Sequence, residues 1–218
     1  MRLRHVRGAQ ERVEASPYCE MAPEARRGAW QGFFDTEGPL YLEIGCGKGR
    51  FLAEHAEREP GINFLGVEKY TSVLLRAIQK QEERMLPNLR FTRMDAEILP
   101  VVFAPGEVAH IYLNFSDPWP KERHAQRRLP SASFLRRYEE ILAPGGTVEF
   151  KTDNEALFDF ALSELPSAGW SAETVSRDLH ADPALSADNI LTEYEARFSA
   201  EGKPIYYVKI RPDKKGEQ

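Results

Sequence analysis

The chain has 218 residues and a formal net charge of −5, and its length fits one α/β domain. A hydrophobic fraction of 42% beside 29% charged residues is typical of a soluble globular protein, and no apolar run approaches the roughly 20 residues that cross a bilayer, which excludes a membrane-spanning helix. The acidic balance excludes a protein that is basic over its whole surface and coats nucleic acid indiscriminately.

The start of the chain lacks apolar periodicity and carries three arginines in its first seven residues, so we expect residues 1–20 to form a basic N-terminal arm. A single domain is predicted over residues 21–212, and residues 213–218 are predicted to be a frayed tail. No apolar stretch follows the first charges, which predicts no secretory signal and a cytoplasmic protein.

Apolar strands and amphipathic helices alternate after the arm. The predicted strands are residues 40–44, 62–67, 89–93, 108–113, 147–151, 171–176 and 205–210. The predicted helices are residues 23–34, 50–58, 71–85, 96–103, 134–142 and 155–165. This alternation indicates an α/β, Rossmann-like fold, a mostly parallel sheet with helices on both faces. Such sheets bind ligands at the carboxyl ends of their strands, so polar residues that follow strands should face one crevice.

The first predicted strand ends in a glycine-rich turn, EIGCGKG, at residues 43–49. Its glycines, Gly45, Gly47 and Gly49, indicate backbone that approaches a nucleotide-type ligand closely, although an ordinary strand-to-helix turn explains the same spacing. A dinucleotide fingerprint needs a further glycine at position 50, where the chain has arginine, so S-adenosyl-L-methionine fits better than a pyrophosphate. The carboxylate of Glu43 suits the ammonium and sulfonium end of that cofactor.

Two more carboxylates follow the next two predicted strands. Glu68 stands where an acidic side chain accepts hydrogen bonds from a ribose diol, and a solvated carboxylate at a strand end is the alternative. Asp95 is placed to accept from the adenine amino group, and a helix N-cap is the alternative. Neither cysteine, Cys19 or Cys46, has a metal-ligand spacing, so we expect free thiols and no metal site.

A proline-rich loop follows the fourth predicted strand and contains Asp117 and Trp119. The prolines on either side of Trp119 fix φ, so the acid and the aromatic ring lose little freedom on binding. Trp119 offers a stacking face to a base, a contact worth about 1–3 kcal/mol, and Asp117 accepts from ring and exocyclic N–H groups. Guanine presents an edge with both kinds of N–H group. For Trp119 the alternative interpretation is that its ring packs in the core.

Cationic side chains crowd this loop and the helix after it, despite the acidic total charge. They are Lys121, Arg123, Arg127, Arg128, Arg136 and Arg137. Patches of this kind act on phosphates within a Debye length, so we expect the segment to bind RNA, and a solvated helix face is the alternative. His124 is expected to contact phosphate or solvent and not to act as a general base.

Four motifs together carry a family resemblance. The stretches EIGCGKG, NFSDPWPKERHAQRRL, FKTDN and LTEYEARF occur in that order, and over nearly its whole length the chain resembles the bacterial tRNA (guanine-N7)-methyltransferases. The resemblance implies an enzyme that binds S-adenosyl-L-methionine and tRNA and methylates N7 of the guanine at position 46 in the variable loop. It places Glu43, Glu68, Asp95 and Asp117 along the cofactor.

The resemblance also places Lys121, Asp153 and the segment from Thr192 to Glu195 against the nucleoside. The residues themselves permit another interpretation. Thr192 and Glu195 have the spacing of a helix capping box, and Asp153 precedes an apolar helix as an N-cap does. The sequence accommodates a monomer or a homodimer.

Two other functions are compatible with these patterns. The loop around Asp117 also resembles that of exocyclic-amino methyltransferases of DNA or RNA, and a non-catalytic cofactor-binding scaffold that docks on RNA is the second alternative. Transfer to N7 needs no general base, because that nitrogen has a free lone pair and no proton, so its rate depends on placement. A carboxylate such as Asp117 would stabilise the positive charge that methylation creates on the purine.

Overall fold

The computed structural model describes residues 6–213. Its strands are β1 (Cys19–Glu20), β2 (Leu40–Ile44), β3 (Asn63–Glu68), β4 (Leu89–Arg93), β5 (Val108–Asn114), β6 (Leu142–Thr152), β7 (Trp170–Ser176) and β8 (Tyr206–Pro212). Its α-helices are α1 (Ala9–Glu14), α2 (Arg50–Arg58), α3 (Thr71–Arg84), α4 (Leu99–Val102), α5 (Ala132–Ile141), α6 (Glu155–Ala168), α7 (Pro183–Ala187) and α8 (Glu193–Ala200). Short 3-10 turns form η1 (Pro23–Arg26), η2 (Trp30–Phe33), η3 (Ala96–Ile98), η4 (Glu122–Arg127) and η5 (Leu179–Ala181).

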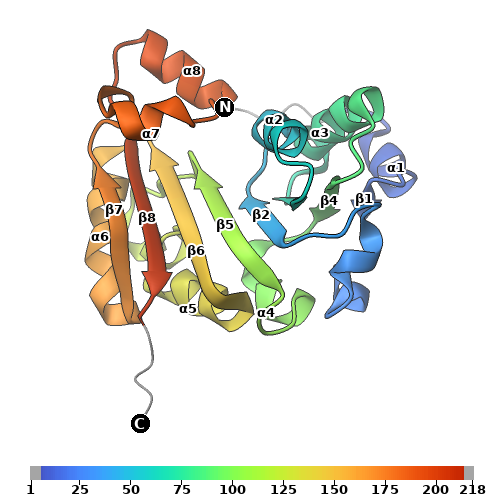
Figure 1. Cartoon of the computed structure of the whole chain (residues 1–218), viewed down its shortest axis with the longest axis horizontal. Coiled ribbons are helices and arrows are strands. Elements are labelled where there is room, and N and C mark those ends of the chain that lie inside the picture. Colours follow the sequence, from blue (N-terminus) through green and yellow to red (C-terminus); the bar gives the residue numbers. More distant parts are fainter. Residues whose placement is uncertain (1–5, 214–218) are drawn as a thin grey trace.

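Across the described residues the strands form one sheet in the order β1-β4-β3-β2-β5-β6-β8-β7 (Figure 1). All neighbouring pairs from β1 to β6 are parallel, and β8 runs antiparallel to both β6 and β7. The predicted mostly parallel, Rossmann-like sheet is therefore confirmed. Because β2 to β6 run in one direction, their carboxyl ends meet at one edge of the sheet.

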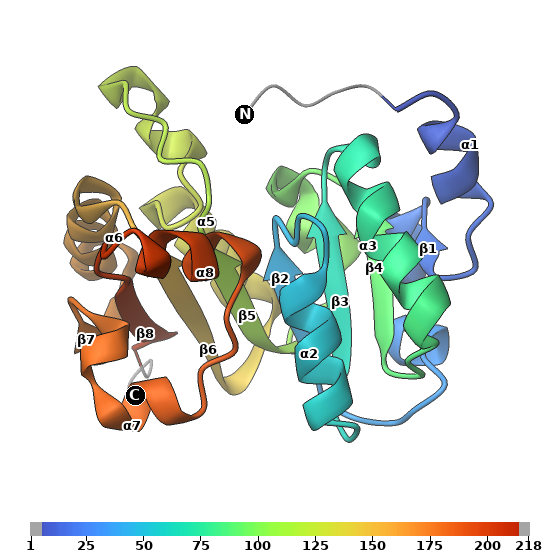
Figure 2. The ribbon, with the colours of Figure 1, turned by 90° about the horizontal axis from the view of Figure 1, so that it is seen from above.

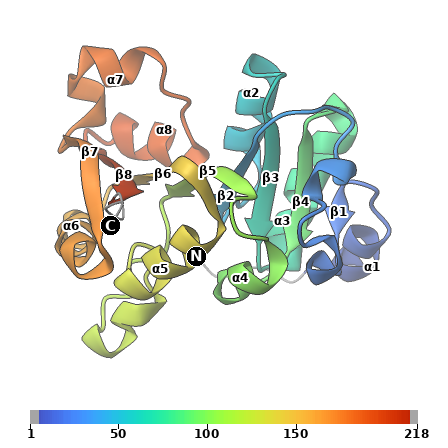
Figure 3. The ribbon, with the colours of Figure 1, turned by 60° about the horizontal axis from the view of Figure 1, so that its bottom comes forward.

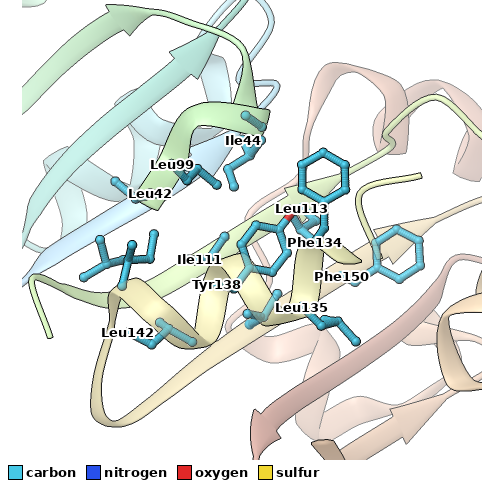
Figure 4. Packing of buried hydrophobic residues seen from close by; sticks show 14 of the residues in the cluster. Leu42, Ile44, Leu99, Ile111, Leu113, Phe134, Leu135, Tyr138, Leu142 and Phe150 are labelled. Carbon is cyan, nitrogen blue, oxygen red and sulfur yellow. The ribbon is translucent and has the colours of Figure 1, made fainter. Parts of the chain in front are cut away.

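The sheet separates two apolar layers. Strand alternation sends Leu42 and Ile44 of β2 into the layer formed with α4, α5 and α6, whereas Tyr41 packs against the layer formed with α1, α2 and α3. Figure 4 shows the first layer, in which Leu42 and Ile111 of the sheet lie near Tyr138 of α5. Full burial of one such side chain is worth about 1.5–3 kcal/mol, so the two layers fix the strand ends that carry the site.

The N-terminal segment differs from the predicted basic arm. Residues 1–5 lie outside the described residues, but α1 packs against α3 and β1 pairs with β4. In α1 only Ala9 and Val13 are buried, so the helix is too short to show an apolar period, and its place depends on contacts with a distant helix.

Other segments also depart from the predicted elements. Strand β6 begins at Leu142, five residues before the predicted strand, and no predicted helix covers α8. The helix predicted over residues 23–34 is two short turns, η1 and η2, because Gly28 with φ 77° interrupts it. Residues 179–191, for which the pattern predicts no element, contain η5 and α7. Within residues 6–213, no helix combines the length and the apolar character needed to cross a membrane.

Candidate active site

The glycine turn and the root of the loop that carries Asp117 meet at the carboxyl edge of the sheet. Strands β2 and β5 are neighbours, with Glu43 opposite Tyr112. Asn114, at the end of β5, donates from Nδ2 to Oε1 of Glu43 over 2.9 Å. This contact joins the glycine turn after β2 to the base of the loop that carries Asp117, so the two motifs share one rim of the sheet.

The glycine turn needs its glycines for two different reasons. Gly45, Gly47 and Gly49 all have left-handed backbone, with φ of 78°, 58° and 69°. A Cβ on Gly49 would lie 2.7 Å from Cβ of Ala77, so only glycine lets α2 start this close to α3. A Cβ on Gly45 would meet nothing within 4 Å, so the turn leaves open space on its outer side.

Glu43 is a buried carboxylate with one oxygen left without a protein donor. It is 3% exposed, and its Oε2 has no hydrogen-bond partner among the described residues. Burial raises the pKa of Glu43 to about 8, although the hydrogen bond from Asn114 and the charge of Lys151 oppose the rise. A cationic ligand with N–H donors would satisfy the second oxygen and favour the ionised form, so the site fits the ammonium end of S-adenosyl-L-methionine.

Glu68 is held by the backbone around it. Its Oε2 accepts from N–H of Gly47 over 3.1 Å, and its Oε1 accepts from Lys69 and Tyr70 over 2.8 and 2.9 Å. Burial raises its pKa against these donors, with the like charge of Asp117 adding to the rise. A carboxylate accepts about four hydrogen bonds, so one acceptor position stays available for a ribose hydroxyl.

Asp95 caps a turn as its alternative interpretation predicts. It accepts from N–H of Glu97 over 3.1 Å at the start of η3 and forms an ion pair with Lys69. The cap orients the carboxylate beside the strand ends and is compatible with a further contact to a ligand. Asp95 therefore lies at the predicted edge, next in the sheet to Glu68.

The loop after β5 is stiff and presents an exposed acid. Phe115 and Trp119 have left-handed backbone, with φ of 52° and 42°, which costs on the order of 1 kcal/mol or more for each bulky residue. Arg128 holds the loop by donating to the carbonyl oxygens of Pro118 and Trp119, each over 3.1 Å. Asp117 lies exposed between the two strained residues.

Trp119 has a polar surrounding and not the core position considered as its alternative. The residue is half-buried. His124 meets its ring edge to face at 5.6 Å, and the Arg127 guanidinium lies 5.2 Å from its centroid. The ring is therefore held at a polar surface by neighbouring cationic and imidazole groups, outside the two apolar layers.

The cationic residues of the loop divide into two groups. Lys121, Arg123 and Arg127 are exposed in or next to η4, which Figures 2 and 3 show as a yellow-green segment that projects from the body of the domain. Arg128 is half-buried, and its donors serve the loop carbonyls. The exposed group is free to meet phosphates, whereas Arg128 acts on the loop itself.

The residues expected near the nucleoside at the C-terminal side lie in protein contacts. Thr192 and Glu195 form the capping box of α8 and are 6% and 0% exposed. The ammonium of Lys151 lies 2.9 Å from Oε2 of Glu195. Asp153 is half-buried and is not the N-cap of α6, because Asn154 accepts from N–H of Leu157 over 2.8 Å. The cap interpretation is confirmed for Thr192 and Glu195 and wrong for Asp153.

Lys151 belongs to the site and is not among the residues predicted for it. Asn114 also belongs to the site, and it is one of the polar residues after a predicted strand that were expected at the crevice. Asn114 is the last residue of β5 and Lys151 is the last but one of β6, and a polar residue at the end of an apolar strand is the sequence signal that points to both. Their partners, Glu43 and Glu195, lie too far along the chain for a pattern to pair them.

The chain matches the family described as "Putative methyltransferase" over residues 37–208. It is 50% identical over 206 residues to a tRNA (guanine-N(7)-)-methyltransferase of Lachnoclostridium phytofermentans, which covers 94% of this chain and 96% of the relative. It is 46% identical over 212 residues to one of Bacillus cytotoxicus, with 97% of each chain covered. The chain belongs to the tRNA (guanine-N7-)-methyltransferase family.

Solved structures of other methyltransferases share the fold of this family member. The 16S rRNA methyltransferase KamB superposes with a TM-score of 0.62 at 14% identity, over 84% of this chain and 91% of that one. A 16S rRNA (adenine(1408)-N(1))-methyltransferase from Catenulisporales acidiphilia, solved with its cosubstrate SAM, superposes with a TM-score of 0.60 at 14% identity, over 91% and 95%. At this level of identity the likeness concerns the fold alone.

Proposed function

We propose that this member of the family transfers a methyl group from S-adenosyl-L-methionine to N7 of the guanine at position 46, in the variable loop of tRNA. The observation that carries the proposal is the meeting of the glycine turn and the Asp117 loop at one sheet edge, joined by the 2.9 Å contact between Asn114 and Glu43. The names of the two curated relatives supply the nucleic acid and the purine nitrogen.

The carboxylates of the first strands hold the cofactor in this proposal. Glu43 accepts from the cofactor amino group at its donor-free oxygen, Glu68 accepts from the ribose, and Asp95 accepts from the adenine amino group. Gly45, Gly47 and Gly49 keep side chains out of the space between them. When bound, the cofactor supplies an activated methyl group on a cationic sulfur.

The loop after β5 places the purine. Trp119 stacks on the base, and Asp117 accepts from the N1–H and amino edge of guanine, the edge opposite to N7. N7 carries a lone pair and no proton, so no residue has to remove one. Methylation leaves the purine positively charged, and the exposed carboxylate of Asp117 stabilises that charge as it develops.

An observation on Arg128 favours N7 transfer over transfer to an exocyclic amine. An exocyclic amine needs a loop carbonyl to accept its N–H while it attacks. The carbonyl oxygens of Pro118 and Trp119 both accept from Arg128. Arg128 occupies both acceptor positions of Trp119 and one of the two of Pro118, and a nucleophile without a proton needs none of them.

The exposed cations beside the loop bind the RNA backbone. Lys121, Arg123 and Arg127 contact phosphates around the variable loop, with Asp153 near the nucleoside. The contacts of Arg128, Thr192 and Glu195 support the walls of the site. Because tRNA is modified in the cytoplasm, we propose a cytoplasmic enzyme, either a monomer or a homodimer.

The test is to map the methylated atom. The protein is incubated with an unmodified tRNA transcript and S-adenosyl-L-methionine labelled in the methyl group, and the product is digested to nucleosides. The proposal predicts labelled N7-methylguanosine, and no label in a transcript with adenine at position 46. Labelled N6-methyladenosine, or the absence of transfer, contradicts the proposal.

A further inference from the structure

Lys151 joins parts of the site that are far apart in the sequence. It lies near the end of β6, where the sheet register pairs it with Asn114 of β5. Its carbonyl oxygen accepts from N–H of Phe115 over 2.8 Å. Phe115 is the first residue with left-handed backbone in the Asp117 loop, so the backbone of Lys151 fixes the root of that loop.

The side chain of Lys151 is committed to the segment before and within α8. It is 6% exposed, and its ammonium donates to Oδ1 of Asn189, to the carbonyl oxygen of Ile190 and to Oε2 of Glu195, over 2.9, 3.1 and 2.9 Å. An ammonium has three donors, so none is left for a ligand. Lys151 therefore acts on protein partners and not on the substrate.

The segment held by Lys151, residues 189–200, forms one wall of the site. Glu193 pairs with Lys48 of the glycine turn over 2.8 Å and with Lys80 of α3 over 3.1 Å. The ring of Tyr194 stacks on Phe115 with 6.3 Å between centroids. Figure 1 shows α8 above the carboxyl ends of β5 and β6, on the side of the molecule where α2 begins.

We propose that Lys151 is a positioning residue for methyl transfer, which holds residues 189–200 against the root of the Asp117 loop through its ion pair with Glu195. Glu195 then acts through Lys151 and does not touch the nucleoside. This inference rests on the proposed function, because its main readout is the transfer reaction.

The pair has a property that makes the inference testable. Loss of one member of a buried ion pair leaves the other charge buried without a partner, whereas replacement of both by apolar side chains of similar length removes the penalty. Methionine is close in length to lysine and glutamate and tolerates irregular surroundings. The double replacement should therefore restore the part of each loss that an unpaired buried charge causes. It does not restore the capping box of α8 and the acceptor for Asn189, which any change of Glu195 to methionine removes.

The experiment compares Lys151→Met, Glu195→Met and the double variant, each at a temperature at which circular dichroism shows it folded. We expect each single replacement to lower kcat by at least about tenfold, and the double variant to have a higher kcat than either single variant. Hydrogen exchange without substrate is the second measurement. Residues 189–200 and 115–121 should lose protection in the single variants and regain it in the double variant. Glu195→Gln, which keeps the shape, serves if Glu195→Met does not fold.

Lys209→Met is the matched control. Lys209 lies on β8, and its ammonium is 4.0 Å from the carboxylate of Glu149. This variant also exchanges lysine for methionine, but at a position whose ion pair does not involve residues 189–200. Its kcat should stay within about twofold of the wild type.

Three results would overturn the inference. A double variant no more active than Glu195→Met would show that Glu195 acts through contacts other than its ion pair with Lys151. Single variants that melt earlier but keep wild-type kcat when folded would show a purely structural pair, and unchanged exchange over residues 189–200 would show no hold on the segment. A wild-type protein that makes no N7-methylguanosine would instead defeat the proposed function, and the exchange measurement still tests the hold.

Discussion

The two halves of the ligand edge are built in opposite ways. On the side of β2, β3 and β4, the acids Glu43 and Glu68 are 3% and 7% exposed and held by neighbouring N–H donors. On the side of β5, the acid Asp117 is exposed, in a loop with left-handed backbone at Phe115 and Trp119. In the proposed function the first half binds a small cofactor by burying it, and the second half presents rigid groups to a large polyanion.

Because of this difference, pH and salt should affect cofactor binding and tRNA binding differently. The buried carboxyl of Glu43, whose pKa is raised to about 8, binds a cation by giving up a proton, a step that salt hardly screens. Exposed arginines bind phosphates by releasing counterions, a step that salt opposes strongly. Changes on one side should therefore alter cofactor binding, and changes on the other should alter turnover or tRNA binding.

Asp117→Asn should have the largest effect. The amide keeps the size of the side chain but removes the charge that faces the developing cation, so we expect kcat to fall on the order of 100-fold while cofactor affinity changes by less than about twofold. Steady-state kinetics with tRNA and calorimetric titration with S-adenosyl-L-methionine measure the two quantities. Asp159→Asn, an exposed acid on α6, is the control and should retain full kcat. Equal turnover of Asp117→Asn and wild type would refute the role of Asp117.

Glu43→Gln should affect the other half. The pKa of Glu43 in the folded protein is about 8, so the carboxyl is mostly protonated at pH 7, and a cationic cofactor favours its ionised form. Binding at pH 7 should release up to one proton, and affinity should rise with pH by up to about tenfold per unit until the pH passes the pKa. Glu43→Gln should bind at least about tenfold more weakly and release no proton.

Titration in two buffers of different ionisation enthalpy measures the proton release for Glu43. Glu97→Gln, a change at an exposed acid within η3, is the matched control. It should keep both the wild-type affinity for the cofactor and the wild-type proton release. Proton release that persists in Glu43→Gln would show that a group other than Glu43 loses the proton.

The same division explains how much the sequence predicts. The bounds of β2 and α2 match the predicted residues 40–44 and 50–58, and the carboxylates Glu43, Glu68 and Asp95 lie at the predicted edge. These elements follow one another as strand, turn and helix, so their pattern is local and periodic.

The contacts of the C-terminal wall lie beyond such patterns. Lys151 and Glu195 are 44 residues apart, and Lys48 and Glu193 are 145 apart, and no periodicity connects them. The N-cap of α6 shows a second reason why single roles are hard to predict. It lies one residue later than expected, at Asn154 and not at Asp153. The sequence therefore predicts the kind of ligand site where its residues are close in the chain. It does not predict the role of a single residue whose contacts come from distant parts of the chain.

Arg127 and Arg128 test whether the loop cations have one role or two. Arg127→Ala should reduce the slope of log affinity for tRNA against log salt concentration by about one, the value of one phosphate contact, with kcat nearly unchanged. Arg128→Ala should lower kcat several-fold as well, because the carbonyls of Pro118 and Trp119 lose their donor. Binding titrations over a range of salt, with parallel kinetics, measure both, and Arg58→Ala on α2 is the control. Identical behaviour of the two variants would contradict the division.

The smallest effect concerns His110, which lies on β5 where the two halves meet. Its Nδ1 is 2.7 Å from Oγ1 of Thr147, and its Nε2 is buried without a hydrogen-bond partner. Burial lowers the pKa of His110 to about 3, with the charges of Lys209 and His55 adding to the fall. The other titratable groups around the ring are Tyr41, Tyr112 and Glu149.

Because the pKa of His110 is lower in the folded than in the unfolded chain, its contribution to stability is full above about pH 6.5 and is lost as the pH falls toward 3. Between pH 6.5 and 5.5 the loss should be about 1 kcal/mol. Glu43 has the opposite sign, so the difference between wild type and His110→Gln isolates the histidine. Urea unfolding at both pH values should show a smaller loss in His110→Gln, which retains a polar partner for Thr147. An equal loss in the two proteins would mean that the junction between the halves does not depend on a neutral His110.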